Sequence, residues 1–284
     1  MVIFTNYQKI RLIWTLLALC LGTLGLPLNG LSQVTKYQDN TQEKELRQFR
    51  ILNQQAFKRG EILTYRLHYG WMDAGEVKVT LTQENLPFGG RNTLHSVCTG
   101  VSKGMVDHFF KVNDRYESYI DESSVMPFLF VRRVNEGGYV INQDYIFNPY
   151  SKKVDVGGNK SAEVPAYCQD MVSAFYYARC LNFDNAHLND VFTVPSFVDG
   201  EYFEIKIRFV GREVISTDLG KIACIRFHPI LQKGRIFKHE EDLNVFISDD
   251  AYHVPVSAQA KILVGSVKMD LIGFEGVGLK FKEK

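Results

Sequence analysis

Residues 61–70 have the sequence Glu-Ile-Leu-Thr-Tyr-Arg-Leu-His-Tyr-Gly, in which larger apolar side chains alternate with polar ones. The side chains on one face are Leu63, Tyr65, Leu67 and Tyr69. This period of two is typical of a β-strand with one buried face. A second alternating run covers residues 77–82, and Asp73-Ala74-Gly75 between the two runs is typical of a turn. Together the runs predict a β-hairpin at the start of a folded domain.

The same alternation continues along most of the chain. It recurs in residues 92–99, 115–120, 128–135, 138–147, 201–210, 213–217, 221–228, 243–248, 254–265 and 266–274. The most regular of these segments is 201–210, where one face carries Phe203, Ile205, Ile207 and Phe209. The chain also holds 20 Phe and 14 Tyr, which suits a pleated core better than a helical bundle.

Residues 170–181 break this period, because their apolar side chains fall at helical spacing. Asp170 is placed to favour the start of a helix there. The expected fold is therefore mainly β: a large curved antiparallel sheet or half-barrel of about 11–13 strands, since an open sheet of that size normally curls. One central amphipathic helix is expected against its concave side. A single β-rich domain is expected over residues 59–284.

The first 32 residues have the features of a secretory signal peptide. Lys9 and Arg11 precede an apolar run over residues 12–26, and Gly30 and Ser32 put small side chains before a cleavage position. A retained anchor is the alternative, although about 15 apolar residues is short of a membrane span. Lipidation at Cys20 is a second alternative, which Leu19 before it disfavours. Residues 33–58 are expected to be a polar linker with a short helix.

Charge and cysteine content exclude several classes of protein. The net charge is +1 and basic residues form no block, so nucleic-acid binding is not expected. The cysteines after the leader are Cys98, Cys168, Cys180 and Cys224, and their spacing matches no zinc pattern. No metal, cofactor or membrane span is expected in the mature chain. A helix between Cys168 and Cys180 would separate their Cα atoms by about 18 Å, too far for a disulfide bond.

One short string allows an enzymatic alternative. Residues 100–104 read Gly-Val-Ser-Lys-Gly, which matches the G-x-S-x-G sequence of serine hydrolases and makes Ser102 a candidate nucleophile. That string functions where a strand turns sharply into a helix above a parallel sheet. Because the surrounding pattern is antiparallel, a turn bounded by glycines is the simpler interpretation.

Four stretches together resemble a bacterial envelope family known as domain of unknown function 3108. They are the run from Phe57 through Gly60-Glu61 to Ala74-Gly75, the run from Asp170 to Arg179, Asp249-Asp250 followed by Val254-Pro255-Val256, and Gly265-Ser266. The resemblance implies export and a predominantly β domain, and it implies no activity or catalytic residues. The expected fold is also similar to the half-barrels of lipoprotein carriers. Location in the periplasm or envelope of a Gram-negative bacterium follows as an expectation.

The function expected from these features is non-enzymatic binding of an apolar or amphipathic ligand, such as a lipid, or of an envelope partner protein. The candidate ligand-binding residues point inward from strands and helix, and they are Tyr65, Met171, Phe175, Phe203, Ile205 and Phe209. The alternatives are a serine hydrolase using Ser102 and a purely structural scaffold.

Overall fold

The structure is a computed structural model that describes residues 49–88, 90–230, 242–261 and 265–282. The signal segment expected at residues 1–32 therefore lies outside the described residues. Among the residues that are described, no helix is both long and apolar enough to cross a membrane.

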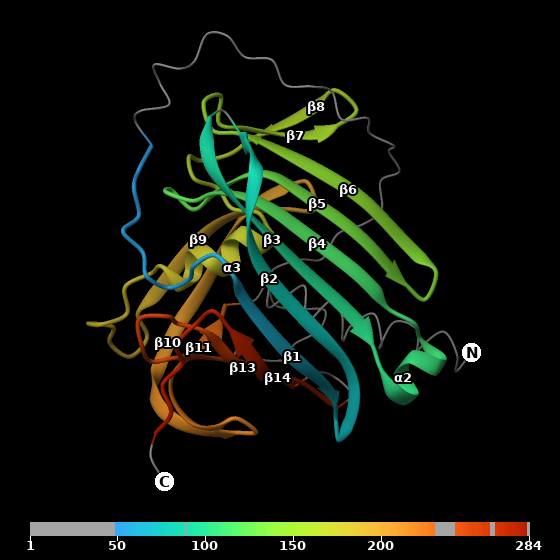
Figure 1. The fold of residues 1–284 in the computed structure, drawn as a ribbon, viewed down its shortest axis with the longest axis vertical. Helices are drawn as coiled ribbons and strands as arrows, with labels where there is room; N and C mark the ends of the chain where they lie inside the picture. The colour runs from blue at the N-terminus through green and yellow to red at the C-terminus, as the bar shows by residue number, and fades with distance from the viewer. Residues whose placement is uncertain (1–48, 89, 231–241, 262–264, 283–284) are drawn as a thin grey trace.

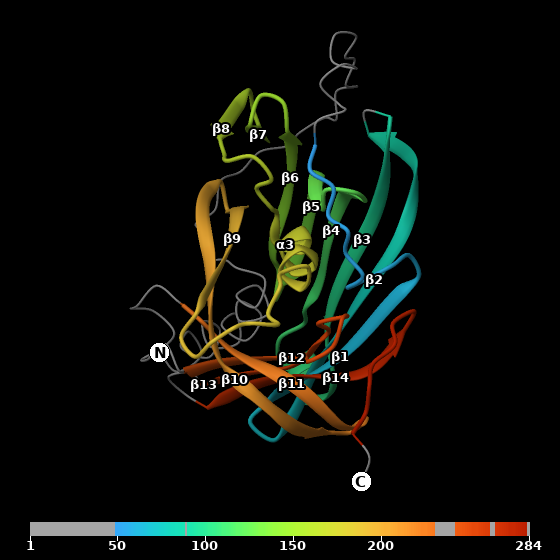
Figure 2. The ribbon, with the colours of Figure 1, turned by 90° about the vertical axis from the view of Figure 1, so that its left-hand side faces the viewer.

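The described chain forms one antiparallel sheet of 14 strands, in agreement with the expected mainly β fold (Figure 1). The first eight strands are β1 Glu61–Tyr69, β2 Met72–Phe88, β3 Arg91–Ser102, β4 Asn113–Asp121, β5 Met126–Glu136, β6 Tyr139–Asn148, β7 Lys153–Gly157 and β8 Lys160–Glu163. The last six are β9 Val191–Val198, β10 Glu201–Thr217, β11 Gly220–Pro229, β12 Leu243–Ser248, β13 Pro255–Lys261 and β14 Ser266–Glu275. Their order in the sheet is β8-β7-β6-β5-β4-β3-β2-β1-β14-β13-β12-β11-β10-β9. The sheet curves strongly without closing into a barrel (Figure 2).

The expected first hairpin is confirmed, but its turn is not where the sequence suggested. The chain reverses at Gly70-Trp71, and Tyr69 lies opposite Met72. Asp73-Ala74-Gly75 lies inside β2 at an irregularity in the register, where Leu67 lies opposite Gly75 and His68 opposite Asp73. A bulge and a turn both tolerate this composition, so local sequence does not separate them.

The strands of the second half also differ in detail from the prediction. Residues 201–210 and 213–217 belong to one long strand, β10, which has a bulge before Gly211. Gly211 has a φ of +150°, a conformation that glycine tolerates best. Strands β7, β8 and β9 were not predicted. The first two are short and largely exposed, while β9 contains Pro195, which an edge strand tolerates because its outer side needs no ladder hydrogen bonds.

Helix α3, Met171–Arg179, lies on the concave side of the sheet, as expected (Figure 2). Its start is fixed by a capping box: the Asp170 carboxylate accepts bonds from the backbone N–H groups of Val172 and Ser173, at 2.7 and 2.8 Å. The Ser173 hydroxyl accepts the Asp170 N–H in return, at 2.9 Å. Ser118 on β4 also donates to the Asp170 carboxylate at 2.5 Å, which ties the helix start to the sheet. Helix α2, Gly104–Phe109, was not predicted and packs beside β2.

The edge strand β9 approaches β6 on the side where α3 lies. Phe197 on β9 contacts the rings of Tyr145 and Phe147 on β6, with centroids 5.3 and 6.4 Å apart. Gln169, just before α3, forms a parallel bridge with Ser196 on β9. Side chains and the α3 connection therefore span the gap between β9 and β6, and the sheet forms a half-barrel.

The segment before β1 belongs partly to the core. Residues 49–58 form neither helix nor strand, and the rest of the segment expected to carry a short helix lies outside the described residues. Ala56 and Phe57 are buried, and the Phe57 ring contacts Tyr176 of α3 with centroids 4.8 Å apart. Sequence analysis predicted a polar linker here because Ala56 and Phe57 form no alternating or helical pattern with other apolar residues.

Candidate binding surface on the concave face

The six sequence-predicted ligand-binding residues do not lie in one place. Tyr65 and Met171 are fully buried in the largest core cluster, and Phe175 and Phe203 pack at its border. Phe209 belongs to a separate cluster with Phe183, Ile225, Phe227 and Ile247. Ile205 is partly buried and belongs to none of the buried clusters that the described residues form. Tyr65 and Met171 thus act as core, while Phe203 and Ile205 lie at the less covered part of the inner face.

These residues differ in burial because α3 covers only part of the concave face. The closest neighbours of the helix are β9, β4, β3 and β5. The inner face of β10 to β14 and β1 continues beyond it. One lateral row there is apolar on every strand, in the order Phe209, Phe227, Val245, Ala258, Met269 and Leu67. Val245 and Met269 in this row are only partly buried.

A second row changes character as it crosses the sheet. From β1 to β6 its members are Leu63, Val79, Cys98, Tyr116, Arg132 and Gln143. The first three are apolar or nearly so, and the last three are polar. The next row places Asp114 on β4 opposite Gly100 on β3. These polar side chains, with Asp114, form the polar part of the concave face. The other inward residues of β5 and β6, which include Phe130, Val134, Tyr145 and Phe147, are apolar.

The polar part centres on Arg132, which is buried. Its guanidinium lies 2.7 Å from the Asp199 carboxylate in the β9–β10 turn. Asp114 accepts the Asn135 N–H at 3.0 Å and is itself buried. Burial, and then the nearby Glu136 carboxylate, raise the pKa of Asp114 to about 7, although the Asn135 N–H and Arg132 oppose the shift. Arg132 was missed by sequence analysis because adjacent arginines usually indicate a solvated strand.

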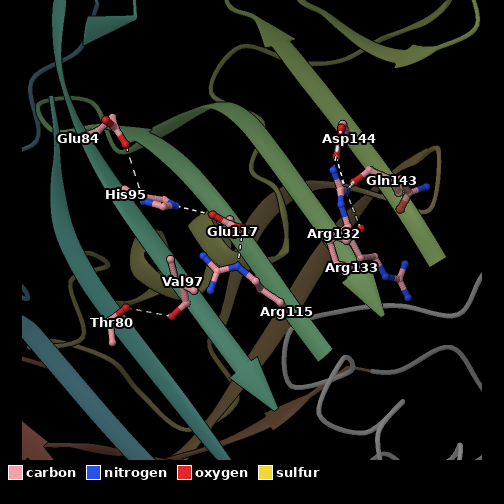
Figure 3. Close-up of polar contacts among 10 residues, drawn as sticks. All are labelled: Thr80, Glu84, His95, Val97, Arg115, Glu117, Arg132, Arg133, Gln143 and Asp144. Atoms are coloured by element: carbon pink, nitrogen blue, oxygen red, sulfur yellow. Dashed lines mark hydrogen bonds and ion pairs between the residues drawn. The ribbon is translucent and has the colours of Figure 1, made fainter. Parts of the chain in front are cut away.

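The outer face of the same strands carries exposed or half-buried ion pairs (Figure 3). The His95 ring lies 2.7 Å from Glu117, which also accepts a bond of 2.6 Å from Arg115. Arg133, the neighbour of Arg132, makes two bonds to Asp144 on β6, at 2.5 and 3.1 Å. Because successive side chains of a strand point to opposite faces, Arg132 and Arg133 serve the inner and outer faces respectively.

The stretches that resemble the family meet at the end of α3. Arg179 makes two bonds to the Glu61 carboxylate, at 2.6 and 2.8 Å, and both side chains are at most 2% exposed. It also donates to the carbonyl oxygens of Ala56 and Tyr252, at 2.6 and 3.1 Å. The His253 ring lies 2.8 Å from the Arg179 carbonyl oxygen. These stretches therefore hold the helix on the sheet and stabilise the fold.

Ser102 is buried and its hydroxyl is hydrogen-bonded on both sides, which disfavours the hydrolase alternative. A helix does follow β3, but the Ser102 hydroxyl donates to Asp107 at 2.6 Å and accepts the Val112 N–H at 2.8 Å. Over the described ranges, its hydrogen-bond partners are these two groups and include no histidine. A general base is needed to activate a serine hydroxyl. The Gly-Val-Ser-Lys-Gly string thus forms a strand end followed by a short helix.

We expect Ser102→Ala to destabilise the protein by about 1–3 kcal/mol, because it leaves the buried Val112 N–H without an acceptor. Urea unfolding measures this change, with Ser161→Ala on the exposed β8 as the matched control. A fluorophosphonate probe should not label Ser102. Covalent labelling at Ser102 would restore the hydrolase interpretation.

Other candidate features give no alternative site. A shallow depression lies between the β6–β7 turn and residues 164–168, and none of the six predicted residues lines it. In the part of the chain that the structure describes, no group of three or more His, Cys, Asp or Glu side chains could hold a metal ion. Cys168 and Cys180 flank α3, and both are free, in agreement with the helix-length argument.

Comparison with known proteins agrees with this fold. A β-barrel-like protein of domain of unknown function DUF1849 from Brucella abortus has a TM-score of 0.52 and 7% identity, covering 78% of this chain and 100% of its own. A lipoprotein candidate from Parabacteroides distasonis has a TM-score of 0.32 and 11% identity, covering 80% and 99%. The lipoprotein LppX from Mycobacterium tuberculosis has a TM-score of 0.17 and 13% identity, covering 77% and 89%. The first similarity shows the fold alone, and the other two are too weak to support an argument.

No curated protein matches the chain. A family model described as protein of unknown function (DUF3108) matches residues 64–272. This range contains nearly the whole sheet and both of the helices that the structure describes. The chain therefore belongs to the DUF3108 family.

Proposed function

We propose that this protein is an exported, non-enzymatic carrier or sensor that binds an amphipathic ligand on the concave face of its half-barrel. The observation that carries the proposal is a cluster of polar side chains around Arg132 on β4 to β6, on an inner face that is otherwise largely apolar. The face thus offers one polar region and one apolar region, which suits an amphipathic ligand. Location in the bacterial periplasm or envelope is part of the proposal and is supported by the basic and apolar pattern of residues 1–32.

The partly buried residues of the apolar part support binding at this place. Phe203 and Ile205 on β10, Val245 on β12 and Met269 on β14 point inward and are only partly buried. Apolar inward side chains that the described core leaves incompletely covered are suited to contact a hydrocarbon chain, whose burial contributes about 0.8 kcal/mol per CH₂. Tyr65 on β1 and Met171 on α3 are fully buried and would stabilise the fold without contacting the ligand.

A fluorescent fatty acyl probe tests this proposal with the purified full chain. We expect saturable binding that Ile205→Glu and, on a different strand, Met269→Lys both abolish, because each places a charge against the hydrocarbon chain. Val214→Glu is the matched control on β10, since Val214 is 52% exposed and should tolerate the charge. Urea unfolding of each variant separates lost binding from lost folding.

The outcomes distinguish a carrier from a scaffold. Binding that survives both inner-face substitutions would place the ligand elsewhere. A chain that binds no acyl probe, and loses stability strongly on both substitutions, would have a packed interior and act as a scaffold.

A further inference from the structure

Three buried polar atoms without a partner gather around the Arg132–Asp199 ion pair. They are Arg132 Nε, Asp199 Oδ2 and Gln143 Oε1, and they make up half of the six such atoms found among the described residues. Arg132 is only 9% exposed. A buried polar group without a hydrogen bond costs about 1–3 kcal/mol, so native proteins keep few of them. Their concentration at one ion pair indicates hydrogen bonds that a bound molecule could complete.

We propose that this set binds the head group of the amphipathic ligand, and that the head group is uncharged or cationic and carries hydroxyl or amine donors. The inference rests on the proposed function and names its ligand class. Two of the three atoms are acceptors, on Asp199 and Gln143, and one is a donor, on Arg132. A hydroxyl group can donate to either acceptor while it accepts the N–H of Arg132.

The surrounding charge argues against an anionic head group. One guanidinium, Arg132, lies with the carboxyl groups of Asp199, Asp114 and Glu136. Asp199 already pairs with Arg132, so the guanidinium charge is not left free for a phosphate or sulfate, and the nearby carboxyl groups give it no further cation to pair with.

The set lies at the start of a strand that carries partly buried apolar residues. Asp199 stands in the turn before β10, and Phe203 and Ile205 on β10 follow it by four and six residues. A strand rises about 3.3 Å per residue, so these residues lie within roughly 13 and 20 Å of Asp199. An amphiphile with a head at the Arg132–Asp199 pair can therefore reach Phe203 and Ile205 with its chain.

Isothermal titration of the purified full chain with three probes of equal chain length tests the inference. The probes are dodecyl maltoside, dodecylamine and dodecyl phosphate, each below its micellar concentration. We expect the maltoside and the amine to bind at least about tenfold more tightly than the phosphate, a difference of about 1.4 kcal/mol. Arg132→Lys keeps the charge but loses the Nε–H, and should weaken maltoside binding about fivefold or more.

Arg133→Lys is the matched control, because Arg133 neighbours Arg132 on β5 and pairs with Asp144 on the outer face. Its maltoside affinity should equal that of the unchanged chain. Asp199→Asn, which removes one carboxylate, should reduce the discrimination against dodecyl phosphate. Unfolding midpoints of all variants show whether each one folds.

The results separate this inference from the proposed function. Phosphate binding as tight as maltoside binding, or equal affinities of Arg132→Lys and Arg133→Lys, would overturn the head-group assignment and leave amphiphile binding in place. Failure of all three probes to bind would overturn the proposed function and the head-group assignment with it.

Discussion

Arg179→Met should destabilise the protein by about 3–5 kcal/mol, because it leaves the carboxylate of Glu61 buried without its partner. The whole folding free energy of a domain is about 5–15 kcal/mol, so a large part of it is lost. Glu61→Leu should destabilise the protein by a similar amount, because it leaves the Arg179 guanidinium buried without its partner. Urea unfolding followed by circular dichroism measures both.

Two controls test whether the loss of stability comes from leaving one buried charge unpaired. Arg66→Met breaks a pair with Asp218 whose side chains are 39% and 75% exposed, and should cost no more than about 1 kcal/mol. The double variant Glu61→Leu/Arg179→Met should be more stable than the Arg179→Met single variant, because no uncompensated charge remains. Equal effects of Arg179→Met and Arg66→Met would show that the end of α3 is not held by this pair.

Stability should fall as pH rises from 5 to 8, because burial raises the pKa of Asp114 to about 7 from an ordinary value of 3.8. Between these values the native state holds a proton that the unfolded chain has released. The stabilisation is therefore fully present below about pH 4 and is lost as pH rises through 7. Three pKa units correspond to a change on the order of 4 kcal/mol. Burial also raises the pKa of Asp170 to about 6, so ionisation of Asp170 likewise lowers stability as pH rises, over a slightly lower pH range.

Asp114→Asn isolates this effect, because asparagine resembles the protonated acid and its oxygen can still accept the Asn135 N–H. The groups that face Asp114 are Glu136, Arg132, Tyr116 and Cys98. The variant should exceed the stability of the unchanged chain by clearly more at pH 8 than at pH 5 in urea unfolding. Asp218→Asn, at a side chain that is 75% exposed, should change neither value. A loss of stability equal at both pH values would mean that Asp114 is ionised in the native state.

Sequence analysis predicted the elements whose pattern depends on one solvated and one buried face. The hairpin of β1 and β2 has this pattern, and so does α3, whose start is fixed by a local cap on Asp170. Strands β7 and β8 were missed because they are short and bury few side chains, and β9 because its last three residues, on both faces, are buried. A six-residue helix such as α2 is too short for a period to appear.

The candidate site was predicted only in part, because it depends on which residues lie side by side on different strands. Alternation indicated that Phe203 and Ile205 point inward, and the structure places them at the less covered part of the inner face. It could not show that Phe209 joins a separate cluster. Arg132 and Asp199 are 67 residues apart in sequence, and only the curvature of the sheet brings them together. Register and curvature are tertiary properties that local pattern does not contain.

Native mass spectrometry of the protein isolated from its own host tests the central claim most directly. The account predicts a population heavier than the bare chain by the mass of one amphipathic molecule, with fragmentation yielding a hydrocarbon chain and an uncharged or cationic head group. Ile205→Glu isolated in the same way should lack that mass, and Val214→Glu should retain it. A single species at the mass of the bare chain, from cells and from mixtures with added amphiphile alike, would contradict the account.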